Sequence, residues 1–149
     1  MSLSDWLPEA AIRTHVNARN WREAVTLCGE ALVAAGTTSA AYTEEMIQTV
    51  EKHGPYIVIA PGLALAHSRP SPAVHRAGLS WVTLASPVEF GSQANDPVDL
   101  IIGLAALDHD GHIEMIAALA SAISDPTSLA RLRAAGGPTE VRTIFDEIA

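Results

Sequence analysis

The stretch Gly54–Pro70 reads GPYIVIAPGLALAHSRP and carries the clearest structural signals of the chain. Its first part, Tyr56–Ala60, is a short β-branched run with proline on both sides, which predicts a strand. Pro61-Gly62 predicts a turn, and Leu63–His67 follows that turn directly. The stretch therefore predicts a strand and a turn that lead to a histidine with polar neighbours.

Two amphipathic helices are predicted upstream of this stretch. Apolar residues recur at helical spacing in Trp21–Ala35, before a glycine that suits a helix end. They recur again at intervals of three and four in Tyr42–Val50, before the break at Gly54-Pro55. Nearer the N-terminus, Ala11–Val16 is predicted to be extended and half-buried.

The downstream half predicts two strands and then helices. Ala77–Ala85 has turn-forming ends, and Val98–Leu107 is nearly all apolar, as expected for a strand covered on both faces. Helices are predicted at His112–Ile123, Pro126–Ala135 and Glu140–Ile148. Because helices alternate with strands, we expect an α/β fold, with a small mixed β-sheet sandwiched between α-helices in a single domain that spans residues 1–149.

The composition excludes several classes of protein. Nine Lys and Arg against seventeen Asp and Glu give a formal charge of -8 at pH 7, which argues against binding to nucleic acid or anionic lipid. Cys28 is the only cysteine, so an intramolecular disulfide is excluded and a reducing compartment is expected. The first residues show no signal-peptide pattern, and no apolar run reaches about 18 residues. We therefore expect a cytoplasmic protein without membrane insertion.

The first candidate site is the end of the opening stretch. His67 follows an apolar segment, with Ser68 and Arg69 beside it. A guanidinium offers a planar fork of donors that matches phosphate oxygens, so this cluster suits an anionic ligand or a transferable phosphoryl group. A histidine that only hydrogen-bonds the backbone in a tight turn would show the same pattern. His15, His53 and His75 are interpreted as ordinary solvated or helix-terminal residues.

The second candidate site is Asp108–His112, between an apolar strand and a helix. Ligands gather at the carboxyl ends of strands, and the N–H groups of a helix start attract anions, so His112 could donate to a phosphoryl oxygen. Alternatively, Asp108 or Asp110 is only an N-cap.

A metal site is another interpretation of the same segment. The residue types that can bind a metal there are His109, Asp110, His112 and Glu114. Glu114 faces away on a helix, and no fixed third ligand is apparent, so we expect no metal.

Four ordered blocks resemble one protein family. These blocks are Gly54–Pro70, Pro87–Gly91, Asn95–Asp99, and Ala105–Asp108 with the following His112-Ile113. They are similar to the mannitol/fructose-type enzyme IIA family of the bacterial phosphoenolpyruvate-dependent sugar phosphotransferase system, and within it to the ascorbate-type (SgaA-like) branch. The resemblance covers nearly the whole chain.

The resemblance implies a phosphoryl carrier. His67 would accept the group from the phosphocarrier protein HPr and pass it to a IIB component, which works with a membrane IIC component. His112 would lie against His67 and stabilise the group, and the N–H groups near Gly111 and the side chains of Ser68 and Arg69 would contact it. No cofactor is required. A homodimer and a sugar such as L-ascorbate are compatible with this branch.

The chain also departs from the family pattern. Ala66 replaces the usual proline before the histidine, Ser68 stands where Ala or Gly is common, and Leu107 stands where lysine is frequent. Lys52 is the only counterpart we find for an arginine that some relatives carry in the preceding helix. Both histidines are intact, so these changes bear on rates and partner choice. A regulatory relative that is switched by phosphorylation, without a role in transport, is the alternative.

Overall fold

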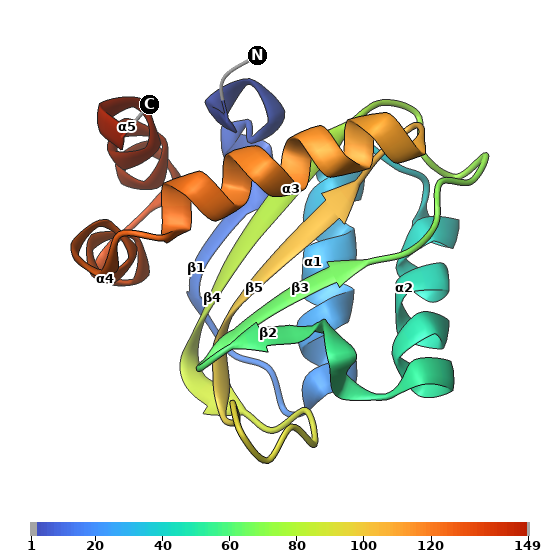
Figure 1. Cartoon of the computed structure of the whole chain (residues 1–149), viewed down its shortest axis with the longest axis horizontal. Coiled ribbons are helices and arrows are strands. Elements are labelled where there is room, and N and C mark those ends of the chain that lie inside the picture. Colours follow the sequence, from blue (N-terminus) through green and yellow to red (C-terminus); the bar gives the residue numbers. More distant parts are fainter. Residues whose placement is uncertain (1–2, 149) are drawn as a thin grey trace.

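The computed structural model describes residues 3–148, and its centre is a five-stranded sheet with the order β1-β4-β5-β3-β2 (Figure 1). The strands are β1 (Ile12–Val16), β2 (Val58–Ala60), β3 (Leu63–His67), β4 (Gly78–Val88) and β5 (Val98–Ala105). β1 runs parallel to β4 and β3 runs parallel to β5, whereas β4 with β5 and β2 with β3 are antiparallel. The predicted small mixed sheet is therefore confirmed.

Helices cover both faces of the sheet (Figure 1). The α-helices are α1 (Trp21–Ala34), α2 (Ala40–His53), α3 (His109–Ile123), α4 (Pro126–Ala134) and α5 (Pro138–Ile148). Short 3-10 turns lie at η1 (Leu3–Trp6), η2 (Glu9–Ala11) and η3 (Pro55–Ile57). α1 and α2 pack on one face, and α3, α4 and α5 lie on the other. The predicted α/β sandwich is confirmed.

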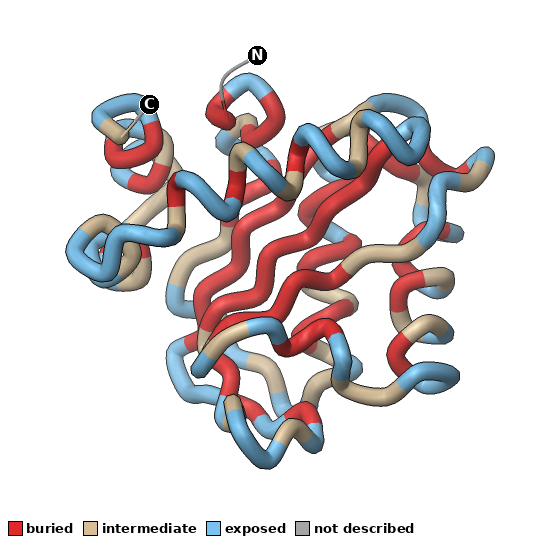
Figure 2. Tube along the Cα trace, in the orientation of Figure 1, coloured by how far each residue is buried: buried red, intermediate tan, exposed pale blue. Residues whose placement is uncertain are grey.

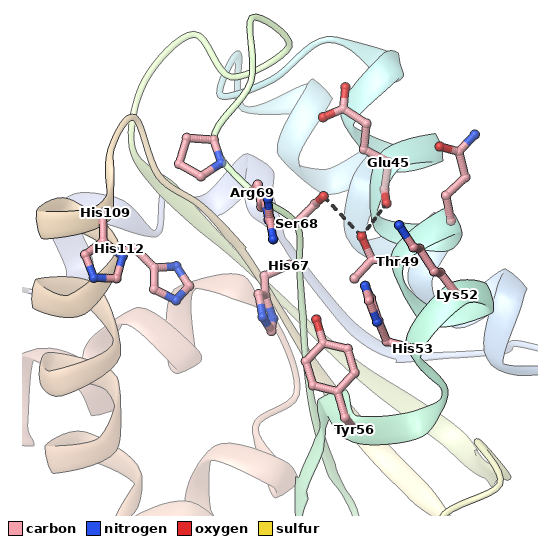
Figure 3. Close-up of a pocket in the computed structure, with 12 residues that line it drawn as sticks. Glu45, Thr49, Lys52, His53, Tyr56, His67, Ser68, Arg69, His109 and His112 are labelled. Carbon is pink, nitrogen blue, oxygen red and sulfur yellow. Dashed lines mark hydrogen bonds between the residues drawn. The ribbon is translucent and has the colours of Figure 1, made fainter.

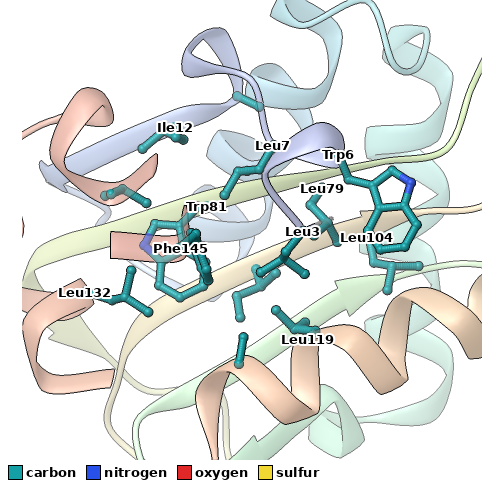
Figure 4. Close-up of a cluster of buried hydrophobic side chains, with 14 of the residues drawn as sticks. Leu3, Trp6, Leu7, Ile12, Leu79, Trp81, Leu104, Leu119, Leu132 and Phe145 are labelled. Atoms are coloured by element: carbon teal, nitrogen blue, oxygen red, sulfur yellow. The ribbon is translucent and has the colours of Figure 1, made fainter. Parts of the chain in front are cut away.

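The three central strands, β3, β4 and β5, are mostly buried on both faces because most of their successive residues are apolar (Figure 2). In β3, Leu63 and Leu65 join the cluster beneath α3 and α5, whereas Ala64 and Ala66 join the cluster beneath α1 and α2. This alternation is the period of two that a strand imposes on its side chains. In the first cluster, the ring of Trp81 packs edge-on against Phe145, with ring centroids 5.0 Å apart (Figure 4).

Two details differ from the sequence prediction. The predicted strand Tyr56–Ala60 is shorter, because Pro55 begins a 3-10 turn that extends to Ile57. Leu63–His67, for which no strand was predicted, forms β3 between β2 and β5. Gly62 makes this possible with a positive φ of 75°, which lets the chain reverse tightly between β2 and β3.

The pairing of β3 with β5 decides where the candidate residues meet. Because the two strands are parallel neighbours, their carboxyl ends lie at the same edge of the sheet, with His67 opposite Leu104. β5 then leads within a few residues to α3. This helix begins at His109 rather than at His112, because the Asp108 side chain caps it by accepting the Gly111 N–H.

Two sequence expectations concern burial and membranes. Cys28 is fully buried beneath the sheet, where burial raises the pKa of its thiol to about 12, so it is a core residue and not a nucleophile. Across residues 3–148, no helix combines the length and the apolar character that crossing a bilayer requires.

Candidate functional site

His67 is the last residue of β3, and the backbone beside it is held by hydrogen bonds from the core. The residues before it, Leu63–Ala66, are buried, whereas the His67 side chain is half-buried. Tyr42 on α2 is fully buried, and its hydroxyl accepts the Ser68 N–H at 3.0 Å and donates to the Leu104 carbonyl at 2.8 Å. One hydroxyl thus joins the ends of β3 and β5 directly beside the imidazole.

The His67 ring is oriented by its own strand. Nδ1 lies 2.9 Å from the Leu65 carbonyl oxygen, which can only accept a hydrogen bond. The bond therefore requires the tautomer with its proton on Nδ1, which leaves the lone pair on Nε2. A backbone-bound histidine was the ordinary alternative for this residue, and the backbone bond is present, with Nε2 left unprotonated.

Two rings flank His67 (Figure 3). The centroid of the His112 ring lies 5.6 Å from that of His67, at an interplanar angle of 47°. The Tyr56 ring lies 5.8 Å away, edge-on at 78°. The structure therefore brings the two candidate histidines together, although 44 positions of sequence separate residues 67 and 112.

His112 stays neutral more readily than an exposed histidine. Partial burial of the ring, together with repulsion from the His67 and His109 imidazoles, holds the pKa of His112 below its usual range. A neutral imidazole has one N–H donor and one acceptor. His112 can therefore donate to an anion, and it can also take up a proton when negative charge arrives beside it.

These residues line a pocket of about 870 Å³ (Figure 3). β3 and the segment after it contribute His67, Ser68, Arg69 and Pro70; α3 contributes His109 and His112; η3 contributes Tyr56; and α2 contributes Glu45, Gln48, Thr49, Lys52 and His53. The side chains that face the pocket include four histidines, a lysine and an arginine. The protein is acidic as a whole, so this is a local concentration of groups that suit an anion.

Of the predicted anion contacts, Arg69 and Ser68 both lie on the pocket wall. Arg69 is exposed and free of the core. The Ser68 hydroxyl lies 3.1 Å from the Thr49 hydroxyl, which itself donates to the Glu45 carbonyl at 2.8 Å. Ser68 is therefore the donor to Thr49, and its proton is engaged by α2 rather than directed into the pocket.

Gly111 does not line the pocket, in contrast to the sequence prediction. Its N–H donates to Asp108 Oδ1 at 2.7 Å, and the His112 N–H donates to the Asp108 carbonyl at 3.1 Å. Both backbone donors are thus used in the start of α3. The alternative interpretation of Asp108 as an N-cap is confirmed, and the side chain of His112, rather than the amides near it, faces the pocket.

Sequence reasoning missed the α2 wall and Tyr56. His53 was interpreted as an ordinary helix-terminal residue, but it faces the pocket, with its ring 6.0 Å from that of Tyr56. The signal was present as a polar stripe at helical spacing, beside the buried face of α2. Its members are Glu45, Gln48, Thr49, Lys52 and His53. His109, which was considered only as a metal ligand, lines the pocket as well.

The described residues do not assemble a metal centre. Within residues 3–148, no three His, Cys, Asp or Glu side chains are placed so that they could hold one ion together. Asp110 and Glu114, the carboxylates of the metal interpretation, are exposed on α3 and do not line the pocket.

Sequence comparisons identify similar proteins of known type. The family model "Phosphoenolpyruvate-dependent sugar phosphotransferase system, EIIA 2" matches residues 5–148. The "Ascorbate-specific PTS system EIIA component" of Escherichia coli (strain K12), where PTS denotes the phosphotransferase system, is 41% identical over 148 residues, or 98% of this chain and 96% of that protein.

Solved structures share the fold. A PTS IIA protein (PtxA) from Streptococcus mutans superposes with a TM-score of 0.89 at 31% identity, covering 99% of this chain and 95% of that one. The complex of enzyme IIAMTL with phosphorylated enzyme IIBMTL from Escherichia coli gives a TM-score of 0.81 at 25% identity, covering 94% and 96%.

Proposed function

This chain belongs to the EIIA 2 family of the phosphoenolpyruvate-dependent sugar phosphotransferase system, and we propose that His67 Nε2 is the atom that carries its phosphoryl group. The observation that carries the proposal is the hydrogen bond from Nδ1 to the Leu65 carbonyl. It selects the tautomer whose lone pair is on Nε2. That lone pair belongs to a half-buried ring on the wall of a pocket rich in donors and positive charge.

Each transfer exchanges one bond to phosphorus for another. In the first step the bond between phosphorus and the histidine of phospho-HPr breaks as His67 Nε2 bonds to phosphorus, and in the second step the Nε2–P bond breaks as a nucleophile of IIB bonds to phosphorus. Charge spreads over the three equatorial phosphoryl oxygens during each step. The groups of this chain that meet this charge are the His112 ring and the Arg69 guanidinium, both on the pocket wall.

His112 adjusts to the charge of its neighbour. Its ring is held neutral in the unphosphorylated protein by burial and by repulsion from two imidazoles, which lowers its pKa. A dianionic group on His67 would replace repulsion with attraction, and the pKa of His112 would rise. Proton uptake by His112 would then accompany phosphorylation and stabilise the carrier state.

The partners in this proposal are proteins, and the surface around the pocket suits them. Three large apolar side chains near the pocket are about half-exposed: Tyr56, Leu107 and Ile113, at 49%, 57% and 52%. Tyr56 belongs to the pocket wall, Ile113 adjoins His112, and Leu107 lies two residues before His109. Large apolar side chains that remain exposed beside a polar site are typical of protein interfaces. We propose HPr as donor and a IIB component as acceptor, with IIC in the membrane and the carrier in the cytoplasm. A homodimer remains a prediction from the sequence.

The identity of the transported sugar is proposed from the similarity of this chain to named relatives. Proteins named as ascorbate-specific EIIA components are about 40% identical to this chain over nearly its full length, for example 41% over 148 residues in Escherichia coli. We propose that the cognate system transports L-ascorbate or a related compound. Transfer should be faster to an ascorbate-type IIB than to a mannitol-type IIB, and equal rates would contradict this assignment.

Labelling by phosphoenolpyruvate with enzyme I and HPr tests the site. Wild type should acquire an acid-labile phosphoryl group, and His67→Ala should acquire none. His75→Ala is the matched control, because His75 is exposed in a loop and does not line the pocket, so it should be labelled normally. Labelling of His67→Ala would refute the assignment of His67. A wild-type protein that is labelled but transfers nothing to any IIB would indicate the regulatory alternative.

A further inference from the structure

Tyr56 lies in the pocket, although no role was predicted for it from the sequence. It belongs to the turn Pro55–Ile57, whose last residue is buried, yet its own side chain is 49% exposed. Its ring contacts His67 on one side and His53 on the other, edge-on in both cases. A large aromatic side chain held half-exposed between two imidazoles is better explained by binding than by packing.

We propose that Tyr56 is a further phosphoryl-binding residue, whose hydroxyl donates a hydrogen bond to an oxygen of the group on His67 Nε2. The inference rests on the proposed carrier function of His67. Tyr56 adds a neutral hydrogen-bond donor to the Arg69 guanidinium and the His112 imidazole, which are already proposed to contact the phosphoryl group.

The position of Tyr56 complements that of His112. The two rings flank His67 at centroid distances of 5.8 Å and 5.6 Å. In Figure 3 they lie on different sides of His67, and the hydroxyl end of Tyr56 points into the pocket. A tetrahedral group on His67 has three terminal oxygens, so donors on different sides can bind different oxygens without competing.

The Tyr56 ring is held in place before any ligand arrives. Its contact with His53 is edge-on at 88°, with centroids 6.0 Å apart, and His53 itself is fixed in the last turn of α2. The backbone is anchored by Pro55 and by the buried side chain of Ile57. A tyrosine has only two rotatable side-chain bonds, so little entropy remains to be lost when the hydroxyl binds. His53 is thereby a positioning residue for Tyr56.

The hydroxyl is a donor under the conditions of transfer. Partial burial raises the pKa of Tyr56 above its usual range, so the phenol keeps its proton at neutral pH. No proton leaves the phenol in this proposal. The N–P bond to the donor histidine breaks as the bond to Nε2 forms, and the hydrogen bond strengthens as the equatorial oxygens gain charge.

Tyr56→Phe provides the test, because it removes the hydroxyl and keeps the ring between His53 and His67. We expect single-turnover transfer from phospho-HPr to slow about tenfold, because a hydrogen bond to a charged phosphoryl oxygen is lost. The melting temperature should not change. The ³¹P NMR signal of the phosphohistidine should shift, because one oxygen loses its donor.

A second variant separates the hydroxyl from the ring. Tyr56→Ala removes both and should be slower than Tyr56→Phe. A wild-type rate and an unshifted ³¹P signal in Tyr56→Phe, with slowing only in Tyr56→Ala, would overturn the proposal, because the ring alone would then account for the effect. Failure of the carrier function itself would appear differently, as wild-type protein that HPr does not label.

Discussion

The two ends of β5 use polar groups in opposite ways. At its start, the Asp96 carboxylate accepts the backbone N–H groups of Phe90, Gly91 and Ser92 at 2.8 to 3.1 Å. At its finish, beside Leu104, the side chains of His67 and His112 face an open pocket. The first end satisfies its polar groups within the chain, whereas the second leaves them accessible in a pocket.

The contrast between the two ends of β5 distinguishes residues that stabilise the fold from residues that serve the site. A carboxylate that gathers several N–H donors fixes a loop, and its loss leaves those donors unpaired. The polar side chains in the pocket contribute less to the free energy of folding. Each of them can therefore give up a contact with water and form one with a phosphoryl oxygen. Changes at the start of β5 should therefore alter the free energy of unfolding, and changes at its finish should alter the rate of transfer.

The largest effect should come from Asp96→Ala. Three backbone donors lose their acceptor, so we expect the free energy of unfolding to fall by about 3 kcal/mol, at roughly 1 kcal/mol for each bond. Urea denaturation measures the change. Glu89→Ala is the control, because this carboxylate on the same loop is exposed. The transfer rate of folded Asp96→Ala should equal that of wild type. A slower rate would contradict the conclusion that the start of β5 serves stability and not transfer.

The next effect is on transfer and comes from His112→Ala. We expect the single-turnover rate to fall about tenfold, or about 1.4 kcal/mol in the activation free energy, because one group that stabilises the phosphoryl charge is removed. The free energy of unfolding should change little. His112→Gln restores an N–H donor and should recover part of the rate. Equal rates for wild type and His112→Ala would remove His112 from the site.

Tyr42→Phe should affect both properties, because Tyr42 links the core to the site. Loss of its hydroxyl leaves the Ser68 N–H and the Leu104 carbonyl without their partner, so we expect the free energy of unfolding to fall by about 1 kcal/mol. Transfer should slow a few-fold as the backbone after His67 loosens. Met46→Leu, a volume-conserving change of a buried residue on the same helix, should leave transfer unchanged. A wild-type transfer rate in Tyr42→Phe would show that the hydrogen bonds of the Tyr42 hydroxyl do not influence the site.

The smallest effect concerns pH. The pKa of His112 is lowered in the folded protein, so below the ordinary histidine pKa of about 6.5 the unfolded chain binds the proton more tightly. Its contribution to stability is therefore present above about pH 6.5 and is lost as the pH falls through the folded pKa. Melting temperatures measured from pH 8 to pH 5 should fall slightly more for wild type than for His112→Gln. Parallel curves would contradict the assigned shift.

Much of the fold could be predicted from local pattern. Helical spacing predicted α1 to within one residue and the central part of α2, and the apolar run of β5 predicted a strand covered on both faces. The resemblance of ordered blocks singled out His67 and His112. β3 was missed because Leu63–Ala66 is buried throughout and mixes small and large residues, so it shows no contrast between an inner and an outer face.

The sequence by itself determined which segments are helical or apolar and which histidines could carry chemistry. Only the tertiary structure decided that β3 lies parallel to β5, which places His67 beside α3, and that α2 brings His53 and Thr49 to the same pocket. It also decided that the Nδ1–H of His67 donates a hydrogen bond to the Leu65 carbonyl. The physical reason is that periodicity reports how each element is buried, whereas strand pairing and ring orientation depend on contacts between residues distant in sequence.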